Sequence, residues 1–175
     1  MEDCGKALKN LDHPDGANCG DSLRLVQLID FLFEAPDYPR PQWLAFNCGL
    51  HDIKTDPASF QRQVELPEYK KNLAAIVAAA RGRSIKVVWI ATTPVDNVLH
   101  RRYCGEFLRF EEDVQAYNLT AASLMGSYQV PVVDLHSFTS SLTGERYIDH
   151  VHFNDETRRL QAAFLAGHFE QLIME

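Results

Sequence analysis

Ile85-Lys86-Val87-Val88-Trp89-Ile90-Ala91 is the clearest strand in the sequence, because it is an apolar run rich in β-branched residues. It follows a segment in which Pro67 begins an amphipathic pattern that closes at Arg81-Gly82, as is typical of a helix. A helix that leads into a buried strand is half of a βαβ unit. The pair therefore predicts an α/β fold with a parallel sheet.

The same alternation continues on both sides of this pair. Further helices are predicted from Asp21 or Ser22 to near Glu34, over 106–128 and over about 155–173, and further strands over 43–46 and 130–135. Strands that alternate with helices predict a mostly parallel sheet covered on both faces. We expect one domain over residues 1–175, with a site beyond the carboxyl ends of the strands.

The composition is that of an ordinary soluble domain, with 46% hydrophobic and 23% charged residues in a chain of 175. The net charge is -7 and the basic residues are scattered, so no nucleic acid partner is expected. No apolar run is long enough to cross a bilayer, so no membrane partner is expected either. The first ten residues lack the hydrophobic stretch of a secretory signal, which predicts a cytoplasmic protein.

The four cysteines do not form a recognisable metal or disulfide pattern. Cys4, Cys19, Cys48 and Cys104 lack C-x-x-C spacing and are too few for a disulfide scaffold. We expect mostly buried thiols. A contact between Cys19 and Cys48 stays open.

Asp149-His150-Val151-His152-Phe153 places a carboxylate three residues before an imidazole, just ahead of the last predicted helix. A histidine oriented by a carboxylate is the proton-handling half of a Ser-His-Asp hydrolase. The motif predicts His152 as general base and Asp149 as its partner, with His150 in solvent. The alternative is that Asp149 caps a loop and His152 is an ordinary surface histidine.

Together with this motif, Asn18-Cys19-Gly20-Asp21-Ser22 and Phe46-Asn47-Cys48-Gly49-Leu50-His51-Asp52 resemble the SGNH, or GDSL-type, hydrolases. Trp89 to Val95 and Asp113 to Asn118 support the resemblance, which covers about residues 17–170 in a consistent order. It implies a flavodoxin-like three-layer sandwich that cleaves esters with serine, histidine and aspartate. It implies no cofactor and no metal, and an oxyanion hole made by a glycine N–H and an asparagine.

The oxyanion block departs from the family pattern, because His51 stands where the family has asparagine. An imidazole N–H can still donate to a developing oxyanion. The alternative is that His51 only bonds a loop carbonyl at the end of the strand.

Gly20-Asp21-Ser22 spells the family's nucleophile signature, but the residues before it do not form the buried strand that the nucleophile follows in the family. Residues 10–19 read as a turn-rich loop. The interval from Ser22 to Gly49 also has room for only one helix and one loop. The block therefore fits the family's second motif better, with Gly20 in the oxyanion hole and Asp21 or Ser22 as a helix N-cap. On this interpretation the nucleophile segment would lie upstream of Met1, and Ser22 is a doubtful nucleophile.

This interpretation predicts that the family's first strand is missing. The loss of an internal strand leaves unpaired backbone groups on the neighbouring strands, unless residues 6–12 or a second copy of the chain fills the gap. Three explanations are compatible with the sequence: a truncated start, a noncatalytic descendant, or a rearranged enzyme that uses Ser22.

Three functions follow from these motifs. The first is hydrolysis of a carboxylester or a carbohydrate O-acyl ester, with a small acyl group on a polar carrier such as a sugar. The second is a catalytically inactive binding module. The third is a metal-dependent hydrolase, in which His150-x-His152 and Asp149 bind zinc or manganese with His51-Asp52, although His-x-His alone is a weak pattern.

Overall fold

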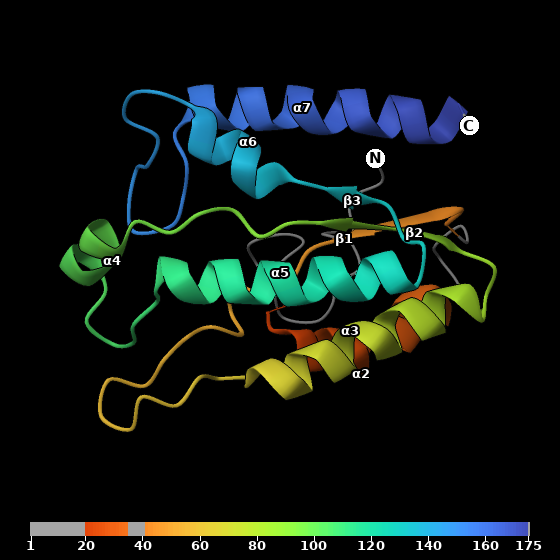
Figure 1. Cartoon of the computed structure of the whole chain (residues 1–175), viewed down its shortest axis with the longest axis horizontal. Helices are drawn as coiled ribbons and strands as arrows, with labels where there is room; N and C mark the ends of the chain where they lie inside the picture. Colours follow the sequence, from red (N-terminus) through yellow and green to blue (C-terminus); the bar gives the residue numbers. More distant parts are fainter. Residues whose placement is uncertain (1–19, 35–40, 175) are drawn as a thin grey trace.

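The computed structural model describes residues 20–34 and 41–174, which form a parallel sheet between layers of helices (Figure 1). The elements, in chain order, are α2 (Ser22–Glu34), β1 (Trp43–Phe46), α3 (Leu66–Arg81), β2 (Lys86–Ile90), α4 (Asn97–Tyr103), α5 (Glu111–Ser127), β3 (Val132–Val133), α6 (Leu135–Ser141) and α7 (Asp155–Met174). The predicted α/β class is confirmed.

The sheet is built around the strand that the sequence marks most clearly. Its order is β1-β2-β3 and both pairings are parallel, with Phe46 opposite Trp89 and Trp89 opposite Val132. Val87, Val88 and Trp89 of the central strand are buried. A central strand covered on both faces needs apolar residues at consecutive positions, which is why this segment reads as an unbroken apolar run.

The helices cover the two faces of the sheet unequally. Figure 1 shows α2, α3 and α5 on one face and α7 on the other, with α6 beside α7. The hydrophobic core lies mainly in the first of these layers, where Tyr69, Leu73 and Ile76 of α3 are fully buried. The hydroxyl of Tyr69 donates to the carbonyl of Cys48 at 2.8 Å, so the central helix also holds the loop that follows β1.

Two short helices and several boundaries differ from the sequence prediction. α4 and α6 were not predicted; each begins after an aspartate whose side chain accepts backbone N–H groups, Asp96 from Val98 and Leu99, and Asp134 from Ser137. The strand predicted over 130–135 is only Val132–Val133, because α6 already begins at Leu135. The helix predicted over 106–128 begins at Glu111, since Leu108 pairs with Thr55 instead.

The outer edge of β1 is where the family's first strand, which the sequence analysis expects to be missing, would pair. Among the residues that the structure describes, β1 pairs with β2 alone. The segment 6–12, which the sequence offers as a substitute strand, lies outside the described residues, as do Cys4 and Cys19.

Within the described ranges, every helix is too short or too polar to pass through a membrane.

Gly49 fixes the close approach between the loops that leave β1 and β2. Its φ is +141°, and a Cβ at this position would lie 2.6 Å from Oγ1 of Thr92. Thr92 also receives a hydrogen bond from the side-chain amide of Asn47 at 3.0 Å, and its backbone is held by Asn118. Glycine is therefore required for both its backbone conformation and its missing side chain.

We expect Gly49→Ala to lower the free energy of unfolding by at least about 2 kcal/mol, because the positive φ alone costs about 1–3 kcal/mol for other residues. Gly167→Ala is the matched control: no atom lies within 4 Å of the added Cβ, and the change within α7 should stabilise by up to about 1 kcal/mol. Urea unfolding followed by circular dichroism measures both. Equal effects of the two substitutions would contradict the packing argument.

Candidate active site

The candidate residues come from the start of α2, from the loop after β1 and from the loop between α6 and α7. Because all three strands are parallel, their carboxyl ends meet at one edge of the sheet. The loop between α6 and α7 reaches the same end of the molecule as α4 (Figure 1). The structure thus places the predicted motifs where α/β folds form their sites.

Residues 147–153, called the relay loop below, form a small closed turn. Tyr147 and Phe153 make an isolated antiparallel bridge, and the N–H of Ile148 donates to the carbonyl of His152 at 2.8 Å. One carboxylate oxygen of Asp149 accepts the backbone N–H groups of Val151 and His152, each at 2.8 Å. The turn therefore sets the direction of the His152 side chain.

Asp149 and His152 form the predicted pair. Nδ1 of His152 lies 2.6 Å from Oδ2 of Asp149. A carboxylate accepts hydrogen bonds, so Nδ1 carries a proton, and in the neutral imidazole the lone pair is on Nε2. Among the described residues, no serine hydroxyl makes a hydrogen bond with either ring nitrogen of His152. The imidazole is 70% exposed, so Nε2 is accessible to a reactant from solution.

The environment keeps Asp149 ionised. Burial alone would raise its pKa, but hydrogen bonds from the N–H groups of Val151 and His152 and from the His152 ring outweigh burial and lower the pKa to about 2. The carboxylate therefore stays negative at any pH at which an esterase works, and it can stabilise a protonated His152.

Ser22 contacts Asp52 and not His152. It is fully buried at the start of α2, and its backbone N–H lies 3.0 and 3.2 Å from the two carboxylate oxygens of Asp52. The side-chain amide of Asn72 donates to its Oγ at 3.0 Å, and the hydroxyl also bonds the Asp52 carboxylate. Asp21 is the N-cap, since its side chain accepts the N–H of Arg24 at 2.8 Å. The Ser22 hydroxyl is thus occupied by two buried polar groups.

The two oxyanion candidates flank this buried contact. Gly20 has a φ of +75° and lies two residues before Ser22. His51 is half-buried and directly precedes Asp52, in a turn closed by the N–H of Ile53 bonding the carbonyl of Gly49 at 3.0 Å. The Ser22 to Asp52 hydrogen bond therefore holds the Gly20 and His51 segments side by side.

Arg109 supports the same turn and was missed by sequence reasoning. Its Nε donates to the carbonyl of Leu50 at 2.7 Å, while its buried Nη1 has no hydrogen-bond partner among the residues that the structure describes. Burial lowers the pKa of the guanidinium to about 10. A single arginine in an irregular segment carries no sequence signal, so only the fold reveals this contact.

His150 is only partly exposed and contacts another histidine, whereas the sequence predicts a solvated side chain. Its Nδ1 lies 3.0 Å from Nδ1 of His100, whose Nε2 faces the carbonyl of Phe107 at 3.1 Å. Burial lowers the pKa of both histidines. His100 and Cys104 come from α4 and its C-cap, and neither was a predicted site residue.

The predicted metal ligands do not come together. Within 20–34 and 41–174, the group of three His, Cys, Asp or Glu side chains close enough to share an ion is His100, Cys104 and His150. It contains His150 but not the other residues of the predicted set. Asp52 is bonded to Ser22, and His152 to Asp149.

Several solved structures share this fold at low sequence identity. They include a GDSL-like lipase from Bacteroides thetaiotaomicron (TM-score 0.66, 17% identity, 87% of this chain and 72% of that one). A lipase/acylhydrolase from Enterococcus faecalis has a TM-score of 0.68 at 15% identity, over 86% of this chain and 71% of that one. A catalytic mutant of an acetylxylan esterase from Geobacillus stearothermophilus has a TM-score of 0.64 at 14% identity, over 83% and 66%.

The sequence comparison gives the family. No curated protein matches the sequence closely enough to count as a relative. A model of the GDSL-like lipase/acylhydrolase family, however, matches residues 11–160, which is most of the chain. This protein therefore belongs to the GDSL-like lipase/acylhydrolase family.

Proposed function

We propose that this protein hydrolyses esters, with His152 as the general base and Asp149 as the carboxylate that orients it. The observation that carries the proposal is the 2.6 Å contact between Nδ1 of His152 and Asp149. It assigns Nδ1 as the donor to Asp149, so Nε2 is the exposed nitrogen that is free to accept a proton in the neutral imidazole, as a general base must.

In the proposed reaction, the hydroxyl of a serine other than Ser22 attacks the ester carbonyl while Nε2 of His152 takes its proton. Asp149 stabilises the imidazolium that results. The negative charge on the tetrahedral oxygen is stabilised by the Gly20 N–H and the His51 side chain. His152 then returns the proton to the departing alcohol, and the same steps with water in place of the serine release the acid.

We assign Ser22 a structural role in this scheme. Its burial and its contacts with Asn72 and Asp52 support a helix start that positions Gly20 and His51. A serine that attacks a substrate must present its hydroxyl to both the substrate and the base. The Ser22 hydroxyl is instead directed to Asp52.

A small acyl group on a polar carrier is the substrate class that we propose. Asp149 is 37% and His152 is 70% exposed, which suits a hydrated ester better than a long acyl chain that must leave water. The acetylxylan esterase that shares the fold is one example of such chemistry on this scaffold, although fold alone does not define a substrate.

The engaged Ser22 also favours a second candidate, a noncatalytic domain that binds esters or sugars. In that case the motif serine would remain only because it holds α2 to the turn at Asp52. The two candidates differ in whether any residue of the folded protein becomes acylated.

Hydrolysis of p-nitrophenyl acetate tests the relay. We expect His152→Ala to lower kcat/KM by about 10²- to 10⁴-fold, the range for loss of a general base. Asp149→Asn should also lower it, because the histidine loses its orienting charge. His168→Ala is the matched control, since this histidine bonds the carbonyl of Phe164 within its own helix, α7, and its rate should equal that of the parent protein. Equal rates for His152→Ala and His168→Ala would overturn the assignment.

Labelling with a fluorophosphonate, followed by peptide mapping, separates the two candidates and names the acylated residue. The hydrolase proposal predicts labelling that depends on His152 and does not occur at Ser22. Label on Ser22 would overturn its structural role. Absence of both labelling and hydrolysis in the folded protein would show that this chain alone supplies no nucleophile, which a noncatalytic domain and a truncated start both predict.

Two substitutions test the buried contact by stability alone. Ser22→Ala leaves the amide of Asn72 without its acceptor and should lower the free energy of unfolding by about 1–3 kcal/mol. Burial raises the pKa of Asp52, although the hydrogen bonds from Ser22 oppose this. A raised carboxyl pKa means that the folded state holds the proton more tightly, so this residue's contribution to stability falls as the pH rises.

The free energy of unfolding of the parent protein, minus that of Asp52→Asn, should therefore decrease from about pH 4 to about pH 7. Urea unfolding across this range measures the difference. A difference that does not change with pH would show that Asp52 has the same pKa in the folded and unfolded chains.

A further inference from the structure

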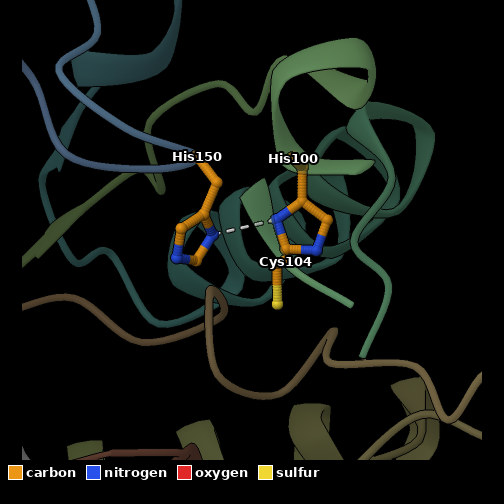
Figure 2. Close-up of side chains that lie close together, drawn as sticks. All are labelled: His100, Cys104 and His150. Carbon is orange, nitrogen blue, oxygen red and sulfur yellow. Dashed lines mark hydrogen bonds between the residues drawn. The ribbon is translucent and has the colours of Figure 1, made fainter. Parts of the chain in front are cut away.

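We propose that His100, Cys104 and His150 bind a zinc ion that connects α4 to the relay loop. Figure 2 shows the three side chains together, with the two imidazoles facing each other. Their ligand atoms all lie within 4.8 Å of one another. Two imidazoles and a thiolate form a donor set that zinc prefers.

The local structure presents two of the three ligands from one turn of helix. His100 and Cys104 are four residues apart, and the N–H of Cys104 donates to the carbonyl of His100 at 2.9 Å, which ends α4. Residues at this spacing lie on the same face of a helix. His150 approaches that face from the relay loop.

The distances are close to those of a metal site. Zinc bonds of about 2.0–2.1 Å to nitrogen and about 2.3 Å to sulfur, in tetrahedral geometry, place ligand atoms about 3.3–3.6 Å apart. The two imidazole nitrogens are 3.0 Å apart, so they need to separate by only a few tenths of an ångström. The longest separation among the three ligand atoms is at most 4.8 Å, so it needs to shorten by no more than about 1.2–1.5 Å.

The second nitrogen of His100 fixes the tautomer that a metal needs. Nε2 lies 3.1 Å from the carbonyl of Phe107, which can only accept, so Nε2 carries the proton and Nδ1 presents its lone pair. Metal-binding histidines usually have such a partner on the ring nitrogen that does not touch the ion. His150 must then donate from Nδ1 to His100 when no ion is bound.

Binding therefore requires two proton movements. The His150 proton shifts from Nδ1 to Nε2, so this ring stays neutral. The thiol of Cys104 loses its proton to solvent, and the resulting thiolate binds the ion. One proton is released for each zinc bound, and no electron transfer is involved.

The surrounding charges favour a site that contains a thiolate. Arg109 and Lys54 both lie over the ring of Phe107, each at 4.8 Å, and both act on His150. They oppose the approach of a dication, whereas a thiolate at Cys104 would attract both cations. The buried Arg109 forms no ion pair among the described residues. A thiolate at Cys104 would give it an anionic neighbour.

The ion would restrain the relay loop without contacting Asp149 or His152. His150 lies between Asp149 and Val151, whose N–H bonds the Asp149 carboxylate, so a metal on His150 restrains the turn that directs His152. Three protein ligands leave a fourth position for water. The ion is therefore a positioning element, and its binding can be measured without any activity assay.

Cobalt(II) in place of zinc gives the direct test, because a cobalt–thiolate bond produces a near-ultraviolet absorption band. We expect one ion per chain by elemental analysis, and the thiolate band in the parent protein. Cys104→Ser should remove the band, and Cys104→Ser and His100→Ala should each weaken binding at least about 100-fold, since even partners outside the ligand shell contribute about 10- to 100-fold.

His152→Ala is the matched control, because it lies two residues from His150 and bonds Asp149 instead. It should keep both the ion and the band while it loses hydrolysis, so failure of the metal site and failure of the proposed function are separate results. If Cys104→Ser does not fold, protection of Cys104 from iodoacetamide by zinc in the parent protein gives the same answer. Substoichiometric metal, a band that survives Cys104→Ser, or equal alkylation with and without zinc would overturn the proposal.

Discussion

The buried contact between Ser22 and Asp52 is the interaction on which the rest of the site depends. It joins the first turn of α2 to the loop after β1, and Asn72 of α3 completes it from the centre of the helical layer. A carboxylate in this position is costly unless N–H and hydroxyl groups satisfy it. Because Gly20 and His51 adjoin its two ends, the contact also sets the spacing between the proposed oxyanion donors. The motif serine thus has a physical reason to be present without attacking a substrate.

The elements that depend on local pattern were predictable, and those that depend on tertiary contacts were not. The apolar run of β2 and the stripes of α2 and α3 are visible in the sequence because burial imposes their period. α4 and α6 are single short helices whose only signals are the capping aspartates Asp96 and Asp134. The start of α5 was misjudged because Leu108 finds its partner at Thr55, far along the chain.

In the candidate site, too, the contacts between residues close in sequence were predictable and the long-range contacts were not. Asp149 and His152 are three residues apart, so their contact could be predicted from spacing. Ser22 meets Asp52 over 30 residues, Arg109 meets Leu50 over 59, and His100 meets His150 over 50. No periodicity connects such pairs, and the contacts exist only because parallel strands bring distant loops to one edge of the sheet.

The closed turn of the relay loop has a consequence for how the site assembles during folding. Its defining contacts, Tyr147 with Phe153 and Asp149 with His152, span only a few residues, so the entropy lost on closing the turn is small. Contacts at such short range form quickly. The segments that contain Gly20 and His51 come together only after α2 packs against α3. The Asp149 and His152 pair is thus a nearly autonomous local structure, whereas the proposed oxyanion pocket exists only in the fully folded protein.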